Sequence, residues 1–115
     1  MMKHSVICGE RWDVVVVPFP FTERPGQKRR PALVLSKRGF NRRGHTVLAM
    51  ITSASHHTWP GDCALTELGA AGLRVACMVR LKLFTLDNRL LIRKVGRLAE
   101  GDCQAVEVSL RAHLW

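Results

Sequence analysis

The sequence predicts a small, mostly antiparallel β-barrel or rolled sheet that ends in one α-helix. Three observations lead to this fold class. Five or six short segments rich in β-branched and apolar residues follow one another, glycine, proline and polar residues separate them, and helical spacing appears only near the end. The intervals between the segments are too short for the repeated crossover helices that parallel strands need. A chain of 115 residues has room for one domain, residues 1–115, and not for two.

The first half of the chain contains three predicted strands. Residues 13–19 (DVVVVPF) form a β-branched run closed by prolines, which cannot donate to a ladder and so end the strand. Residues 31–36 (PALVLS) are the second strand. Residues 45–52 (HTVLAMIT) have apolar residues at both odd and even positions, which is typical of a central strand covered on both faces. The intervening residues, 21–29 and 37–44, are predicted loops.

The second half contains shorter strands and then the helix. Residues 62–65 are a possible short strand, and the glycines within 69–72 break the chain. Residues 75–83 and 90–96 are two further strands, with a turn or one helical turn at residues 87–88 between them. Apolar residues then recur at helical spacing from Glu100 onward, at Cys103, Val106, Leu110 and Leu114.

The charge of the chain favours an anionic partner. Its formal net charge is +9, and no acidic residue lies between Glu23 and Asp62. That stretch holds eight basic residues: Arg24, Lys28, Arg29, Arg30, Lys37, Arg38, Arg42 and Arg43. Such a surplus creates a positive field that attracts polyanions, so a nucleic-acid or phosphate surface is one interpretation. A solvated basic loop and a surface covered by an acidic partner are the alternatives.

The cysteines and the hydropathy pattern argue for a reduced, cytoplasmic protein. Cys8, Cys63, Cys77 and Cys103 form no CxxC pair and have no zinc-site spacing, so free thiols in apolar surroundings and no metal are expected, while a disulfide stays open. No apolar run approaches the ~20 residues that span a bilayer. The first twelve residues mix charged side chains into a short apolar patch, which is unlike a signal peptide.

A candidate phosphate site follows from the ends of two predicted strands. Pro31 favours an extended conformation for Arg30 and so places its guanidinium at the mouth of a strand. A guanidinium can hold a phosphate through two parallel hydrogen bonds and can stabilise the added charge of a five-coordinate phosphorus. Thr52 and Ser53 end the next strand, and their hydroxyls can bond phosphate oxygens. The structural alternatives are an arginine paired with a carboxylate or water and a Thr-Ser pair that completes a turn.

Taken in order, several segments resemble one known family. WDVVVVPFPFT, RRPALVLS, AMITS, AGL, VRLKLFTLD and GRL occur in the order and at the spacing seen in the MazF/PemK-type toxins, the mRNA interferases, from about Arg11 to the end of the chain. The resemblance implies a small SH3-like barrel of the MazF/PemK/CcdB type with a C-terminal helix. It also implies a homodimer that binds single-stranded RNA across its interface, and a cognate antitoxin, commonly acidic, that blocks the groove.

The resemblance also implies a reaction and its residues. These toxins cut RNA without a metal or cofactor, using the substrate 2′-hydroxyl as the nucleophile and leaving 2′,3′-cyclic phosphate and 5′-hydroxyl ends. Arg30 matches the catalytic arginine before the proline, Thr52 matches the strand-end hydroxyl residue, and Ser53 beside it could assist. Arg80 matches a basic residue that some members use near the phosphate. Lys82 stands where some members have an acidic residue.

The sequence identifies the general base and the general acid less clearly than the phosphate-binding residues. Several members have a glutamate five positions before the arginine, whereas Glu23 lies seven positions before Arg30. Glu23 is the candidate general base, and its alternative role is that of a loop carboxylate paired with a neighbouring arginine. Lys82 or a histidine such as His56 is the candidate acid.

Further RNA contacts are expected beside these residues. Lys28 and Arg29 precede Arg30 and add positive charge, and His56 lies in a loop that could flank the groove. Trp59, in the same polar loop, is the best candidate for stacking a flipped-out base, which is worth roughly 1–3 kcal/mol.

A second class of function uses the same barrel without catalysis. CcdB-type gyrase poisons act through C-terminal residues that include a tryptophan, and this chain ends in His113-Leu114-Trp115. An inactive homologue that binds an antitoxin but does not cut RNA is the other non-catalytic alternative.

Overall fold

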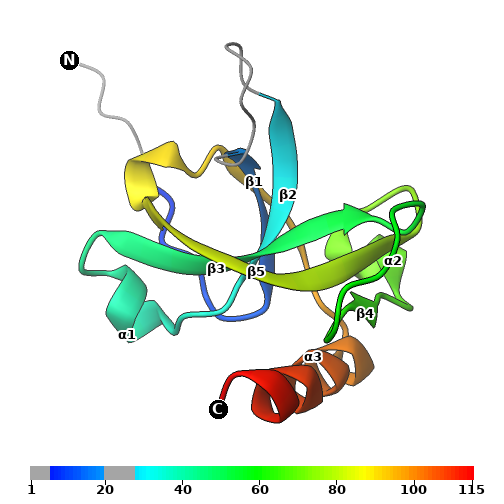
Figure 1. The fold of residues 1–115 in the computed structure, drawn as a ribbon. Helices are drawn as coiled ribbons and strands as arrows, with labels where there is room; N and C mark the ends of the chain where they lie inside the picture. The colour runs from blue at the N-terminus through cyan, green and yellow to red at the C-terminus, as the bar shows by residue number, and fades with distance from the viewer. Residues whose placement is uncertain (1–5, 20–27) are drawn as a thin grey trace, which may run out of the picture.

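One six-stranded sheet, in which every paired strand is antiparallel to its neighbour, forms the body of the fold (Figure 1). The computed structural model describes residues 6–19 and 28–115. The strands are β1 (Asp13–Pro18), β2 (Arg29–Val34), β3 (His45–Ser53), β4 (Cys63–Ala64), β5 (Cys77–Asp87) and β6 (Arg93–Arg97), in the spatial order β4-β5-β3-β2-β1-β6. The helical elements are α1 (Arg38–Asn41), α2 (Leu68–Ala71), η1 (Asn88–Leu90) and α3 (Glu100–His113). The predicted class, a mainly β fold that ends in a helix, is confirmed.

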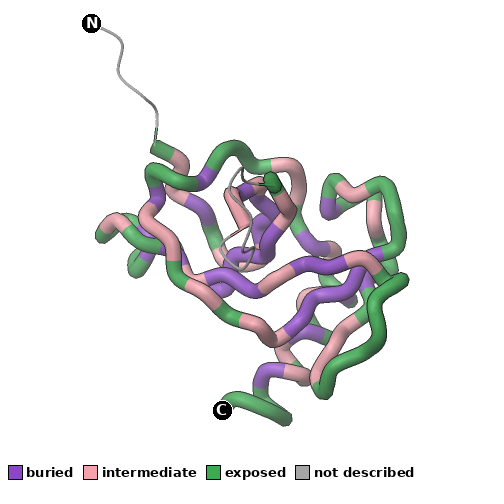
Figure 2. The backbone as a smooth tube through the Cα atoms, turned by 45° about the horizontal axis from the view of Figure 1, so that its top comes forward, coloured by how far each residue is buried: buried purple, intermediate pink, exposed green. Residues whose placement is uncertain are grey.

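The sheet curls into a half-barrel and is covered on both faces. One face packs against α3, where Val106 and Leu110 are buried in the same cluster as Val14, Leu33 and Ile51. The other face carries a second buried cluster: Val15, Val17, Ala32, Val34, Leu48 and Leu91. Because both faces of the sheet are covered, the strands at residues 13–18 and 45–53 have apolar residues at both odd and even positions. Figure 2 shows the resulting buried stretches along the crossing strands.

The helix α3 is tied to the segment between β4 and α2 by its third residue, Asp102. This carboxylate is 2% exposed and accepts hydrogen bonds from the Thr66 backbone N–H, the Thr66 hydroxyl and the Glu67 backbone N–H, at 2.8–3.1 Å. Burial by itself raises the pKa of Asp102, but these hydrogen bonds outweigh it and the pKa lies below its usual value. Asp102 therefore stays charged and holds α3 against the segment that leads into α2.

Two parts of the chain that the sequence presented as loops contain short helices. Residues 37–44 hold α1, because the fully buried Asn41 amide donates to the Gly9 carbonyl at 2.8 Å and the Ser36 carbonyl at 3.0 Å. Residues 69–72, where glycines were expected to interrupt regular structure, form most of α2 and its C-terminal cap. The cap is Gly72, whose φ is 75°. A Cβ on Gly72 would lie 2.1 Å from the Val95 carbonyl oxygen, so α2 approaches β6 too closely for any side chain there.

The last strands differ from the prediction in their bounds. The strand predicted at 75–83 runs on to Asp87, because β3 is long enough to pair with it as far as His45. The strand predicted at 90–96 begins only at Arg93, since η1 occupies Asn88–Leu90. Of the turn or single helical turn expected at residues 87–88, the structure has the helical form, η1, which begins one residue later at Asn88. The Asp87 carboxylate before it accepts a hydrogen bond from the Arg89 N–H at 2.8 Å.

The four cysteines are free thiols, as predicted. Burial raises the pKa of Cys63, Cys77 and Cys103, so these thiols stay protonated near neutral pH. In the described part of the chain, none of the helices combines the length and apolar character needed to cross a bilayer.

Candidate functional site

Arg30 and Thr52 meet at one pocket. The pairing of β2 with β3 ends at Ala32 and Met50, and Arg30 and Thr52 each lie two residues beyond that last pair. Residues two apart along a strand share a face, and so do the paired residues Ala32 and Met50, which puts Arg30 and Thr52 on the same face of the sheet. Both residues line a pocket of about 180 Å³, together with Ser53 and Arg74. The two predicted strand-end groups therefore face a common space.

The Arg30 side chain is half-buried and has one donor that no described residue uses. Its guanidinium carbon lies 5.2 Å from the centroid of the Phe19 ring. Within the described residues, its Nε is buried and has no hydrogen-bond partner. A buried polar group without a partner is rare in proteins and calls for an external ligand or a functional role. An anionic group in the pocket could accept from this guanidinium.

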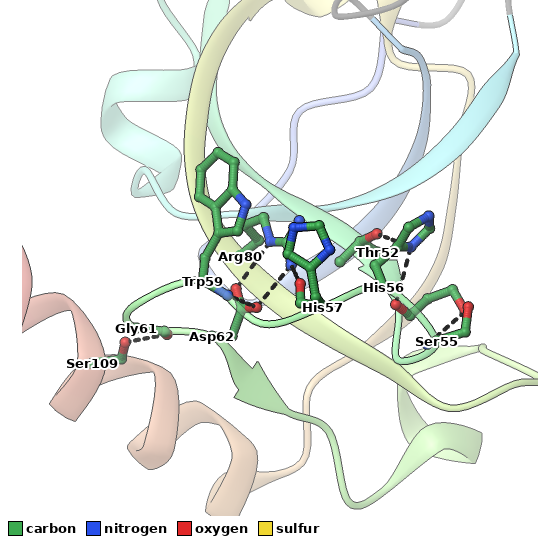
Figure 3. A network of polar contacts seen from close by, with 10 residues as sticks. Thr52, Ser55, His56, His57, Trp59, Gly61, Asp62, Arg80 and Ser109 are labelled. Atoms are coloured by element: carbon green, nitrogen blue, oxygen red, sulfur yellow. Dashed lines mark hydrogen bonds and ion pairs between the residues drawn. The ribbon is translucent and has the colours of Figure 1, made fainter.

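Thr52 links the pocket to a histidine. Its side chain is buried, and its Oγ1 lies 3.1 Å from Nδ1 of His56 (Figure 3). The same Nδ1 lies 3.3 Å from the Ser53 carbonyl oxygen. Because a carbonyl oxygen can only accept, this contact requires the proton to be on Nδ1, and the neutral ring then has its lone pair on Nε2. His56 is exposed, so Nε2 can take a proton from a ligand.

A buried ion pair holds the loop that follows β3. The Arg80 and Asp62 side chains are 8% and 4% exposed and approach to 2.9 Å. Arg80 donates to Asp62 through Nε at 3.1 Å and through Nη2 at 2.9 Å, and Nη2 also donates to the His57 carbonyl at 2.7 Å. The Arg80 guanidinium carbon lies 4.7 Å from the centroid of the Trp59 ring. Figure 3 shows Arg80, Asp62 and Trp59 close together at this loop.

Asp62 carries a negative charge within this group. Burial by itself raises the pKa of Asp62, but the hydrogen bonds from Arg80 and from the Trp59 N–H, with the charge of Arg80, outweigh it and lower the pKa below its usual value. The pair is therefore ionised at neutral pH. Arg80, predicted from the resemblance to lie near the phosphate, has its charge balanced by Asp62 and lines the loop instead of the pocket.

The remaining predicted residues lie around these two groups. Lys28 and Arg29 are exposed at the start of β2, next to Arg30. The Ser53 hydroxyl lies 2.9 Å from that of Ser55. Lys82 Nζ lies 5.7 Å from the centroid of the Trp59 ring. Glu23, the candidate general base, lies outside the described residues.

Arg74 is a pocket residue that the sequence did not single out. It is exposed and follows α2. Its place beside Arg30 depends on the packing of α2 against β6, whose glycine Gly96 leaves no room for a Cβ against the Ala71 backbone. No spacing or motif in the sequence links residue 74 to residue 30, so only its charge could have pointed to it. Among the described residues, no group of three or more His, Cys, Asp or Glu side chains is placed to share a metal ion.

Comparisons with known proteins place this geometry in context. The family profile described as "PemK-like, MazF-like toxin of type II toxin-antitoxin system" matches residues 10–114. No curated protein matches the chain. A solved structure of MazF from Deinococcus radiodurans is 25% identical, with a TM-score of 0.69 over 94% of this chain and 97% of that one. An endoribonuclease from a mycobacterial species, in complex with its cognate antitoxin, is 17% identical, with a TM-score of 0.73 over 92% and 94%. The Mycobacterium tuberculosis toxin MazF-mt6 is 16% identical, with a TM-score of 0.69 over 87% and 93%.

The family match and the structural likeness agree over nearly the whole chain. The solved structures share the curled antiparallel sheet and the helix after it, and the family profile includes both Arg30 and Thr52. Because the profile begins at residue 10 and ends at residue 114, every element from β1 to α3 lies inside the match. The chain therefore belongs to the family of PemK-like, MazF-like toxins of type II toxin–antitoxin systems.

Proposed function

We propose that this protein is a toxin endoribonuclease that cleaves single-stranded RNA, with the scissile phosphate held in the pocket between Arg30 and Thr52. The observation that carries the proposal is the pocket itself, which has two guanidinium groups and two hydroxyls on its wall. A phosphodiester needs donors of this kind, because its charge rises as phosphorus becomes five-coordinate. The unused Nε of Arg30 supplies a donor that no described residue occupies.

The proposed reaction uses the RNA as its own nucleophile. The substrate 2′-oxygen forms a bond to phosphorus while the bond from phosphorus to the 5′-oxygen breaks, which leaves a 2′,3′-cyclic phosphate and a 5′-hydroxyl. A base takes the proton of the 2′-hydroxyl and an acid gives one to the departing oxygen. No metal ion or cofactor has a role in this scheme.

His56 is the described residue best placed to move a proton. Its contact with Thr52 sets it at the edge of the pocket, and its Nε2 has the lone pair in the neutral ring. Glu23 stays a second candidate base, and Lys82 a second candidate acid. The RNA chain on either side of the cut would contact Lys28, Arg29, Ser53 and Trp59.

The partners follow from the family. We propose that the protein forms a homodimer in the cytoplasm, that RNA lies across the dimer interface, and that a cognate, acidic antitoxin covers the same basic surface. The excess of positive charge supports this, since both RNA and an acidic protein segment would be attracted to it. The mycobacterial relative was solved with its cognate antitoxin.

The deciding experiment is cleavage of a long RNA in the presence of EDTA, with mapping of the new ends. We expect discrete cuts that carry 5′-hydroxyl groups. Arg30→Ala should reduce the rate by about 10²–10³-fold or more, the effect of removing one donor to a developing negative charge. The matched control is Arg42→Ala, which removes an equal charge from an exposed position after α1, at the opposite end of β3 from the pocket.

Four results would contradict the proposal. Full activity of Arg30→Ala would remove the mechanism, and loss of wild-type cleavage in EDTA would remove the metal-free reaction. Intact RNA together with trapped, cleaved DNA–gyrase complexes would favour the gyrase-poison alternative. Intact RNA with retained antitoxin binding would indicate an inactive homologue.

A further inference from the structure

We infer that the loop of residues 54–62 is a preformed subsite for one RNA base, in which Trp59 is the stacking platform and Arg80 positions the ring without gripping phosphate. The inference rests on the proposed function for its ligand class, single-stranded RNA. It assigns to Arg80 a role different from that of the neighbouring pocket arginines.

The Trp59 ring is presented to solvent with positive charge behind it. The residue is 40% exposed, which is unusual for so large an apolar side chain. Arg80 Cζ and Lys82 Nζ lie 4.7 Å and 5.7 Å from its centroid. Both cations come from β5, at the point where its register with β3 shifts. Both lie against the ring, and Lys82 would attract the phosphates that flank a stacked base.

The loop is fixed at three points, so the ring needs little ordering when a base arrives. The Trp59 N–H donates to the Asp62 carboxylate at 2.7 Å. Arg80 Nη2 donates to the His57 carbonyl at 2.7 Å, and the Ser109 hydroxyl of α3 donates to the Gly61 carbonyl at 2.6 Å (Figure 3). A preorganised site avoids the entropy cost of ordering a loop during binding.

The subsite lies next to the phosphate pocket. Thr52 pairs with Met78 and Met50 pairs with Arg80, so Thr52 and Arg80 extend from the same face of the sheet in neighbouring rows. Two residues along a strand span about 7 Å. The loop also begins directly after Ser53, a wall residue of the pocket, and His56 within it contacts Thr52. A nucleotide next to the scissile phosphate could therefore reach Trp59.

The buried ion pair argues against a phosphate contact by Arg80. Its side chain is 8% exposed, and the charge is balanced by Asp62. A phosphate that took Nε or Nη2 of Arg80 would have to displace the Asp62 carboxylate or the His57 carbonyl, which would release the loop. The geometry fits a residue that acts through Trp59.

The test compares base-bearing and base-free strands of equal charge. Fluorescence anisotropy measures the dissociation constants of 2′-O-methylated ten-residue oligonucleotides, which lack the 2′-hydroxyl nucleophile, and of an abasic sugar–phosphate strand of the same length. Trp59→Ala should weaken binding of the base-bearing strands by about 5- to 150-fold and leave the abasic strand unchanged. Trp115→Ala is the matched control, since it removes another exposed tryptophan, at the end of α3.

Arg80→Lys separates positioning from phosphate contact. Lysine keeps the charge but loses the fork that bonds Asp62 and the His57 carbonyl together. We expect weaker binding of base-bearing strands only, and no additional loss when Arg80→Lys is combined with Trp59→Ala. Circular dichroism confirms that each variant is folded. Weaker binding of the abasic strand by Arg80→Lys, or a loss that persists in the Trp59→Ala background, would overturn the positioning role.

The outcomes also distinguish this inference from the proposed function. Equal affinity of wild type and Trp59→Ala for base-bearing strands would overturn the subsite while RNA cleavage remained intact. If Trp59→Ala weakened only self-association in sedimentation experiments, the ring would belong to a protein interface and the subsite would be wrong. Trp59-dependent binding without any cleavage of unmodified RNA would support the subsite and contradict the nuclease.

Discussion

At the scale of single residues, the candidate site depends on one buried donor that no described residue uses and on one oriented imidazole. Arg30 has a buried Nε without a described partner, which is the arrangement expected of a residue that binds an anionic ligand. Arg80, of the same residue type and near by, bonds Asp62 and the His57 carbonyl through Nε and Nη2. Two arginines close to one pocket thus have different partners, and we propose different roles for them.

His56→Gln should separate proton transfer from binding. Glutamine keeps a polar side chain near Thr52 but cannot titrate, so we expect kcat to fall by about 10²–10⁴-fold with little change in KM. Steady-state cleavage of a short fluorogenic RNA measures both.

The control for this prediction is His57→Gln. His57 is also exposed, and its bond to Arg80 uses the backbone carbonyl and not the ring. An equal loss in both variants, or an unchanged rate in His56→Gln, would contradict a role for His56 in proton transfer.

At the scale of elements, short polar attachments decide where helices and loops sit. Asp102 fixes α3 to the segment before α2, and the Arg80–Asp62 pair fixes the loop after β3. Neither attachment joins neighbouring residues in the chain. The elements they join could be recognised from hydropathy, but their connection could not.

Asp102→Asn should destabilise the fold in a pH-dependent way. Hydrogen bonds to a charged acceptor contribute more than neutral ones, and we expect a loss of about 1–3 kcal/mol at pH 7 in urea unfolding. Because folding lowers the pKa of Asp102 below the ~3.9 of an unfolded aspartate, its contribution is complete above that value. The contribution is lost as the pH falls through the lower pKa of the native state, so the difference between the variants should shrink in acid.

Glu107→Gln provides the comparison within the same helix. Glu107 pairs with Arg111 one turn later at 2.9 Å, where an ion pair on a helix surface is worth about 0.3–0.5 kcal/mol. Two results would show that the buried carboxylate does not hold α3. One is a similar loss of unfolding free energy in both variants. The other is a difference between wild type and Asp102→Asn that grows as the pH falls.

At the scale of the whole molecule, the excess of basic residues creates a positive electrostatic field. The arginines of the pocket contribute only part of it. Residues 24–61, with eight basic and no acidic residues, account for most of the net charge of +9, and RNA binding should depend on the cations that actually contact phosphates. Lys28 and Arg29 adjoin Arg30 at the start of β2, whereas Arg42 and Arg43 lie beyond α1.

Salt dependence of RNA affinity should distinguish these two pairs. Each phosphate contact to a single strand contributes about −0.7 to the slope of log K against log salt concentration. Replacing Lys28 and Arg29 by serine should reduce that slope by about 1.4, whereas the same change at Arg42 and Arg43 should alter it much less. Titrations at four salt concentrations measure the slopes, and equal changes in both double variants would contradict a local RNA path beside β2.

The sequence by itself determined the kinds of element and much of their order. Runs of valine, isoleucine and leucine bounded by proline and glycine identify strands whose buried faces are set by local chemistry, and helical spacing identified α3. Pro31 restricts Arg30 to an extended conformation wherever the strand lies. The order and spacing of the motifs predicted the family, and the family profile confirmed it over residues 10–114.

The tertiary structure alone decided which side chains meet. Strand register brings Arg30 and Thr52 to one pocket, the packing of α2 on β6 adds Arg74, and the curl of the sheet buries Arg80 against Asp62. A register shift of one residue would send either pocket side chain to the other face without changing any local propensity. These side-chain contacts depend on the pairing and packing of elements that are far apart in the chain, so no local sequence pattern encodes them.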